Sequence, residues 1–190
     1  MIEKDVLDLL EETGALLTGH FELRSGLHSE RFFQCANLLR FPRKAELLCK
    51  VLVENVTSSD LVGQIDAVIS PAVGGIIVGH EVARALNVIS IFAEKENDRL
   101  VMRRFAIEKG ARYVIAEDVI TRGGRVQETI DLVEAGGGEV AAIALLVDRS
   151  GGKVKFDHPT FSLVEMEPVV WDPKECPLCK QGSVAVHPGS

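Results

Sequence analysis

A strand, a turn and a helix in the middle of the chain constrain the fold more than any other feature. An apolar run, residues 113–116, ends in two adjacent carboxylates, Glu117 and Asp118. A short turn with two glycines follows, and the next segment has the apolar spacing of a helix. Such a run is typical of a buried parallel strand, and ligands of open α/β sheets bind beyond the carboxyl ends of these strands. The sequence therefore predicts a βα unit with a ligand site at its turn.

The residues of this turn suit a sugar phosphate. Backbone N–H groups of a turn and a helix N-terminus can bind a phosphate, whereas two carboxylates would repel one. Glu117 and Asp118 suit the neighbouring hydroxyls of a ribose, or a metal ion. The alternative is an ordinary strand-to-helix turn, in which glycine serves a positive φ and the acids are solvated. The pattern favours a site for a ribose that carries a phosphate.

The rest of the chain repeats the alternation of strands and helices. A helix over 4–12, a hairpin or hood within 19–34 and a helix from Pro42 to about Val56 come first. The expected strands are 67–70, 88–93, 100–105 and 140–147, besides the strand and helix of 112–135. This rhythm predicts an α/β fold: a doubly wound, mostly parallel sheet flanked by helices, with a small N-terminal hood.

The charge and the hydropathy of the chain restrict its partners. The net charge is −7, and nucleic-acid binding needs a basic face, so no nucleic-acid partner is expected. No apolar run approaches the length of a membrane span and the first residues show no secretory signal, so we expect no membrane partner and a cytoplasmic location. A local cluster can still bind an anion, because salt screens exposed charges beyond about 8 Å. The candidates are Arg99, Arg103, Arg104, Arg122 and Arg125.

Two cysteines near the C-terminus, Cys176 and Cys179, have the spacing of a zinc knuckle. One knuckle supplies two of the four ligands that structural zinc takes. His158 or His187 could supply a third, but the sequence places neither nearby. An inert turn, a metal site and a redox pair therefore stay open, and no protein metal site is assigned.

The run Glu117-Asp-Val-Ile-Thr-Arg-Gly-Gly124 resembles the phosphoribosyl-pyrophosphate (PRPP) motif of the type I phosphoribosyltransferases. The resemblance implies that the turn binds the 5′-phosphate, that the two acids receive the ribose hydroxyls, and that Asp118 is catalytic because it faces the developing positive charge. It also implies Mg²⁺, carried by PRPP without a dedicated protein cage. The residues of this segment implied to bind PRPP are Glu117, Asp118, Thr121, Arg122, Gly123, Gly124 and Arg125.

A second segment, residues 70–75, occupies the place of the family's pyrophosphate loop. There the resemblance implies that backbone N–H groups of Ala72, Val73 and Gly74 approach the leaving diphosphate. Many members of the family have a lysine where this chain has Gly74. Taken alone, the segment could be an ordinary strand-to-helix turn.

A third segment matches the family's mobile catalytic loop only in part. Lys95 begins a Lys-Glu pair of that loop, which implies a catalytic and PRPP-binding role for this lysine. The second lysine, the histidine and the glycines of the loop are missing. In the family this loop reaches the neighbouring subunit's site, so a homodimer is implied, with the loop from Lys95 to Arg104 near that site.

The hood and the end of a strand indicate the acceptor. Residues 21–33 resemble the N-terminal hood of the orotate phosphoribosyltransferases, with a basic-Ser-Gly stretch followed by Ser-x-x-Phe-Phe. Aromatic rings can flank a flat pyrimidine, and a guanidinium suits the orotate carboxylate. The residues implied to bind orotate are Arg24, Phe32, Phe33, Thr121 and Arg149.

The resemblance implies the transfer of the 5-phosphoribosyl group of PRPP to orotate, giving orotidine 5′-monophosphate and pyrophosphate in pyrimidine (UMP) biosynthesis. Within a single domain we expect residues 1–40 to form a helix and hood that contribute to the base site, 41–167 the PRPP-binding core, and 168–190 a peripheral tail. Two other functions stay open. One is a phosphoribosyltransferase for another base, such as a purine, and the other is a non-catalytic regulator that senses PRPP.

Overall fold

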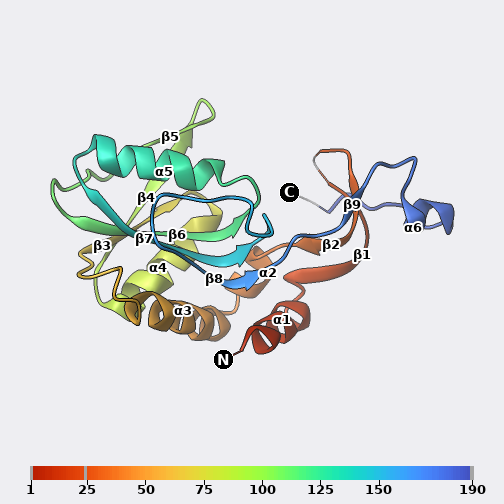
Figure 1. Cartoon of the computed structure of the whole chain (residues 1–190), viewed down its shortest axis with the longest axis horizontal. Helices are drawn as coiled ribbons and strands as arrows, with labels where there is room; N and C mark the ends of the chain where they lie inside the picture. The colour runs from red at the N-terminus through yellow and green to blue at the C-terminus, as the bar shows by residue number, and fades with distance from the viewer. Residues whose placement is uncertain (1, 24, 189–190) are drawn as a thin grey trace.

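The structure, a computed structural model, describes residues 2–23 and 25–188. Its main body is built around a six-stranded sheet of order β5-β4-β3-β6-β7-β8 (Figure 1). All neighbouring strands pair in parallel except β5, which is antiparallel to β4. The strands are β3 (Ala67–Pro71), β4 (Ile89–Glu96), β5 (Arg99–Val101), β6 (Arg112–Ile120), β7 (Glu139–Asp148) and β8 (Thr160–Glu165). The predicted mostly parallel α/β sheet is confirmed.

Helices cover both faces of this sheet (Figure 1). Successive residues of a strand point to opposite faces, so Val68 packs in the core under α3 and α4 while Ile69 packs in the core under α5. Burial of each such aliphatic side chain contributes about 1.5–3 kcal/mol. None of the described helices is both long enough and apolar enough to cross a membrane. The helices are α1 (Glu3–Glu12), α2 (Ala36–Leu39), α3 (Pro42–Thr57), α4 (Gly74–Leu86), α5 (Gly124–Ala135) and α6 (Pro177–Lys180).

The hood is a separate three-stranded sheet of order β1-β2-β9. Its strands β1 (Leu16–Glu22) and β2 (His28–Phe33) form the predicted antiparallel hairpin, and β9 (Val170–Trp171) adds to β2. Figure 1 shows the hood at one end of the molecule, with α6 beside it. The segment expected to be a peripheral tail therefore supplies one strand of the hood and packs against it.

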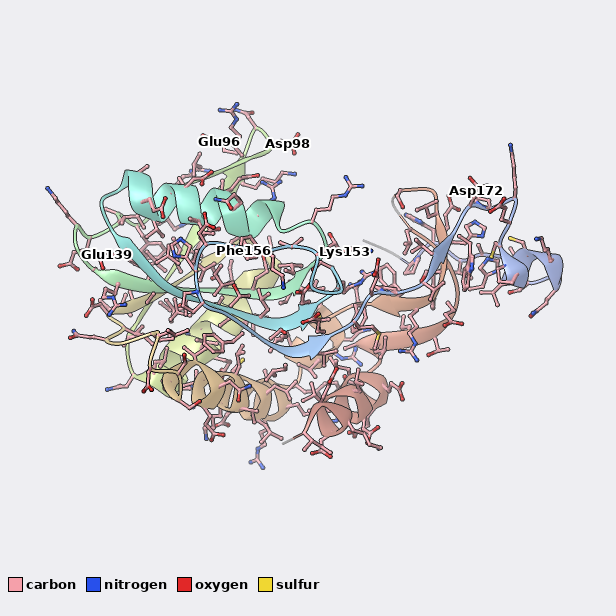
Figure 2. All side chains as sticks on the ribbon, viewed as in Figure 1. Glu96, Asp98, Glu139, Lys153, Phe156 and Asp172 are labelled. Atoms are coloured by element: carbon pink, nitrogen blue, oxygen red, sulfur yellow. The ribbon has the colours of Figure 1, made fainter. Side chains whose placement is uncertain are left out.

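The segment between β4 and β5 is a tight hairpin. Asn97 and Asp98 have φ values of 48° and 63°, the positive φ at both central residues that a two-residue type I′ turn requires. β5 ends at Val101, so the strand expected over 100–105 is only half as long as predicted. Figure 2 shows Glu96 and Asp98 at the tip of this hairpin, which projects beyond the main body.

Candidate active site

The turn between β6 and α5 forms a hollow at the start of the helix. α5 has no side-chain N-cap bond, so its first N–H groups remain available to a ligand. Gly123 has φ +70°, and a Cβ there would lie 2.7 Å from Val154 Cγ1, so only glycine fits. The hollow has a volume of about 300 Å³. Its lining residues are Glu117, Val119, Ile120, Thr121, Arg122, Gly123, Gly124, Arg125, Val126 and Glu128.

The two carboxylates lie near the end of β6: Glu117 lines this hollow, whereas Asp118 lines neither this hollow nor the larger cavity described below. Glu117 is buried and Asp118 is half-buried. Glu117 Oε1 accepts a hydrogen bond from the Asp118 N–H at 3.0 Å, and Asp118 Oδ1 accepts one from the Val119 N–H at 2.8 Å. Burial raises the pKa of both carboxyl groups, and the negative charge of Asp118 raises the pKa of Glu117 further. A ligand that donates hydrogen bonds or positive charge would relieve this repulsion.

We expect Glu117→Gln to stabilise the ligand-free protein at neutral and alkaline pH. Because the folded-state pKa of Glu117 is raised, the folded state binds more protons than the unfolded state between the two pKa values. The free energy of unfolding therefore falls as pH rises through that window. Glutamine stays neutral and keeps the acceptor for the Asp118 N–H. Each pKa unit corresponds to about 1.4 kcal/mol, so the melting temperature should rise by a few degrees at pH 8.

Thermal unfolding of both proteins across pH tests this expectation. The gain should disappear in acid below the unfolded-state pKa, where Glu117 is protonated in both states. Glu96→Gln is the matched control, because Glu96 is exposed at the hairpin tip and its substitution should leave the melting curve unchanged (Figure 2). A Glu117→Gln protein that is less stable than the wild type at pH 8 would contradict this expectation.

The loop between β3 and α4 lies directly beside the carboxylates. A Cβ on Gly74 would lie 2.8 Å from Asp118 Oδ2, and one on Gly75 would lie 3.0 Å from Glu117 Oε1. Glycine at both positions therefore lets the start of α4 approach the acid pair. The Ala72–Val73 peptide bond in this loop is cis. The structure thus brings the two predicted phosphate-binding segments together.

A second, larger cavity of about 750 Å³ lies between the hood and the turn after β6. It shares Val119, Thr121 and Arg122 with the first hollow, so the two lie next to each other. The structure brings Phe32, Phe33, Thr121 and Arg149 to one cavity, as the resemblance implies; Arg24 lies outside the described residues. The lining residues are Glu22, Leu23, Ser25, Phe32, Phe33, Gln34, Val119, Thr121, Arg122, Arg149, His187 and Pro188.

Arg149 is the most unusual charged side chain of this cavity. Its guanidinium lies 5.4 Å from the centre of the Phe33 ring. Its Nε is buried and has no hydrogen-bond partner among the described residues, where it also forms no ion pair. Burial lowers the pKa of this guanidinium. Arg149 is half-buried, and partial removal of a cation from water without an acidic partner is costly, so this geometry favours an anionic ligand.

Other predicted cations lie outside the two cavities or have partners within the protein. Lys95 Nζ pairs with Asp98 Oδ1 at 2.6 Å within the β4–β5 hairpin, and it lines neither cavity. Arg125 pairs with Glu128 at 2.8 Å and donates to the Asp98 carbonyl. Of the five arginines proposed as an anion-binding cluster, only Arg122 and Arg125 line a cavity, and of these only Arg122 lines both.

The C-terminal contribution to the larger cavity is not apparent in the sequence. Val186 N donates to the His20 carbonyl at 2.8 Å, and Glu22 N donates to the Val186 carbonyl at 2.9 Å. This return along β1 places His187 and Pro188 in the cavity wall. Their separation from the hood by more than 150 positions leaves no local signal.

Comparison with known proteins finds relatives over the whole length of this chain. The phosphoribosyl transferase domain family matches residues 42–179. A protein named orotate phosphoribosyltransferase from Heliobacterium modesticaldum is 48% identical, over 100% of this chain and 99% of its own length. One of the same name from Thermotoga maritima is 43% identical, over 97% of both chains.

Solved structures show the same fold at lower identity. The orotate phosphoribosyltransferase of Aeropyrum pernix matches with a TM-score of 0.68 at 24% identity, over 85% of this chain and 94% of its own. The adenine phosphoribosyltransferase of Rhodothermus marinus matches with a TM-score of 0.65 at 23% identity, over 86% of this chain and 99% of its own. Proteins named for different bases share this fold, so the acceptor must be argued from the site and from the full-length relatives.

Proposed function

The chain belongs to the orotate phosphoribosyltransferases of the phosphoribosyl transferase domain family, and from this premise we propose how its residues carry out the reaction. PRPP and orotate react to give orotidine 5′-monophosphate and pyrophosphate. The observation that carries the choice of acceptor is Arg149, a half-buried side chain whose guanidinium has no acidic partner among the described residues. The carboxylate of orotate can pair with this guanidinium, whereas a purine base has no carboxylate.

The acceptor binds in the larger cavity, between the hood and the turn after β6. Phe32 and Phe33 supply aromatic surface for the pyrimidine ring, and the Arg149 guanidinium already lies over one of these rings. Thr121 belongs to both cavities, which supports its placement between base and sugar phosphate. An acceptor in this cavity lies next to the donor, and the two reacting atoms gain from proximity.

The donor binds along the smaller hollow and the neighbouring β3–α4 loop. The 5′-phosphate accepts hydrogen bonds from the N–H groups that begin α5, beside Thr121 and Gly124. The ribose hydroxyls donate to Glu117 and Asp118. The diphosphate binds the loop of Ala72, Val73 and Gly74. The support for this arrangement is the close approach of Gly74 to Asp118, which places the loop and the acid side by side.

The residues around the anomeric carbon stabilise the charge that develops during the reaction. As the bond to the diphosphate breaks, positive charge develops on the sugar, and the Asp118 carboxylate stabilises it. Mg²⁺ fits this site, because the carboxylate oxygens of Glu117 and Asp118 are the hard ligands that it prefers; when bound with PRPP it would neutralise charge on the leaving group.

The two arginines of the turn should differ in their contribution to PRPP binding. Arg122 is exposed, lines both cavities and forms no ion pair within the described part of the chain, whereas Arg125 is held by Glu128. We expect Arg122→Ala to raise the KM for PRPP about tenfold, from loss of roughly 1.5 kcal/mol in a charge-assisted bond. Arg125→Ala should change it much less. Steady-state kinetics with varied PRPP measure both, and the reverse order would contradict this assignment.

We propose a cytoplasmic homodimer in which the β4–β5 hairpin lies near the neighbouring site. Apolar side chains exposed near the β3–α4 loop support an interface there: Val73 is 82% exposed and Ile77 46%. Lys95 must leave its pair with Asp98 to reach PRPP. The division into hood, core and C-terminal segment stays part of this proposal. Sedimentation equilibrium tests the dimer, and a single species of monomer mass at high concentration would contradict it.

A panel of bases tests the acceptor. With PRPP and Mg²⁺ present, pyrophosphate release should occur with orotate and not with uracil, adenine or hypoxanthine. Uracil is the informative control, because it keeps the pyrimidine ring and lacks the carboxylate. Turnover with a purine would show that the cavity has been misassigned. Binding of PRPP without turnover of any base would favour the regulator.

A further inference from the structure

Four side chains with metal-binding atoms meet where the β1–β2 hairpin of the hood packs against α6. His20 lies on β1 and His28 begins β2. Cys176 directly precedes the short helix α6, and Cys179 lies within it. The ligand atoms of all four lie within 4.8 Å of one another. His20, His28 and Cys176 are buried and Cys179 is half-buried. The cluster is separate from the cavities described above, none of whose lining residues belongs to it.

The distances within the cluster approach those of a tetrahedral site. Cys176 Sγ lies 3.5 Å and Cys179 Sγ 3.7 Å from His20 Nε2. Cys179 Sγ lies 3.3 Å from His28 Nδ1, and the two ring nitrogens are 2.9 Å apart. Bond lengths of about 2.0–2.1 Å to nitrogen and 2.3 Å to sulfur in a tetrahedron require ligand separations of about 3.3–3.8 Å. Small movements of the four side chains would therefore centre an ion among them.

We propose that His20, His28, Cys176 and Cys179 form a structural zinc site that joins the C-terminal segment to the hood. Two thiolates and two imidazoles are a donor set that zinc takes in closed, four-coordinate sites. Four protein ligands leave no open position, so the site is structural rather than catalytic.

Neither of the other interpretations explains this geometry. A redox pair needs only its two cysteines, whereas here a histidine nitrogen lies against each sulfur. An inert turn would place no demand on His20, yet its Nε2 faces both sulfurs and its Nδ1 is buried without a hydrogen-bond partner among the described residues. The ring orientation of His20 is thus set by the cluster. His158 and His187, the histidines considered from the sequence, lie outside it.

The site would anchor the chain that closes the base cavity. The hood has few buried apolar side chains, and small units with little core commonly depend on a metal. Beyond α6, the chain returns along β1 through the hydrogen bonds of Val186 and then contributes His187 and Pro188 to the cavity. Loss of zinc should therefore loosen this wall as well as the hood. This consequence for orotate binding rests on the proposed function, whereas the metal site itself does not.

Metal analysis of the full-length chain, purified without chelators, tests the proposal. We expect about one zinc ion per chain by mass spectrometry, a lower melting temperature after chelation, and recovery on addition of zinc. Co²⁺ in place of zinc should give the visible absorption of a tetrahedral site with thiolate ligands. Cys179→Ala should lose the metal, and Cys49→Ala, which removes a buried cysteine from α3, should retain it.

Two results would overturn the proposal. One is a wild-type protein without zinc whose melting temperature does not respond to added zinc. The other is full zinc content in Cys179→Ala. If that variant fails to fold, the chelation and Co²⁺ measurements on the wild type still decide. None of these readouts depends on catalysis, so failure of the metal site and failure of the proposed reaction remain distinguishable.

Discussion

Asp118→Asn should lower kcat by about 100- to 1000-fold while PRPP still binds. Loss of one group that stabilises transition-state charge commonly has an effect of this size. Asparagine has nearly the shape of aspartate and can still accept the hydrogen bond that Asp118 Oδ1 receives from the Val119 N–H. It lacks only the negative charge, so the fold and the donor site should persist. The initial rate of orotate consumption measures kcat, and calorimetric titration with PRPP measures binding.

The surroundings of Asp118 explain why this acid, rather than Glu117, should dominate the chemical step. Asp118 Oδ2 faces the place that a Cβ of Gly74 would occupy, between the two phosphate-binding segments. Glu117 is more deeply buried and bonds the backbone of its neighbour. Asp131→Asn, on the exposed face of α5, is the matched control and should leave kcat unchanged. Equal kcat values for wild type and Asp118→Asn would contradict the mechanism.

Arg149→Met should raise the KM for orotate about 100-fold and leave the KM for PRPP nearly unchanged. A charge-assisted pair with a carboxylate contributes roughly 2–3 kcal/mol, and methionine keeps an apolar stem against the Phe33 ring. The same substitution removes a half-buried guanidinium that lacks an acidic partner among the described residues, so stability should stay the same or increase. Weaker binding of orotate in a protein of unchanged or higher stability would show that a contact has been lost and that the protein is not misfolded.

Arg40→Met is the control for this experiment. Arg40 also lies near an aromatic ring, 5.0 Å from the centre of Phe41, but it is exposed and does not line the cavity. The KM of the Arg40→Met protein for orotate should match that of the wild type. An unchanged KM in Arg149→Met would show that the carboxylate of the acceptor binds elsewhere.

Much of the fold could be predicted from local patterns. The apolar run before Glu117 predicts a strand, and the apolar spacing after Gly124 predicts a helix. Both are present, as β6 and α5. Because strands β3, β6 and β7 are adjacent and parallel, their carboxyl ends bring the predicted loops and Arg149 to one edge of the sheet. Periodicity within a segment was sufficient for this part of the site.

Contacts between distant segments could not be predicted in this way. β9 is two residues long, too short for a periodic signal, and its pairing with His28 and Ser29 spans about 140 positions. The meeting of His20 and Cys176 depends on this pairing and on the return of the C-terminal segment. The sequence alone therefore offered two of the four proposed metal ligands and no means to find the others.

The turn of the β4–β5 hairpin has a local sequence signal. The resemblance to a mobile catalytic loop instead implies a loop from Lys95 to Arg104. Asn97 and Asp98 are residue types that tolerate positive φ, and two of them between extended stretches are typical of a tight turn. Turn chemistry at these two positions would have predicted a hairpin in place of a long loop.

The most direct test of the account is the ultraviolet absorbance of orotate in a mixture of protein, PRPP and Mg²⁺. We expect the orotate band to fall only when every component is present, with orotidine 5′-monophosphate and pyrophosphate formed in equal amounts. Unchanged orotate in a sample whose melting temperature PRPP still raises would contradict the central claim, because the donor site would then exist without the acceptor.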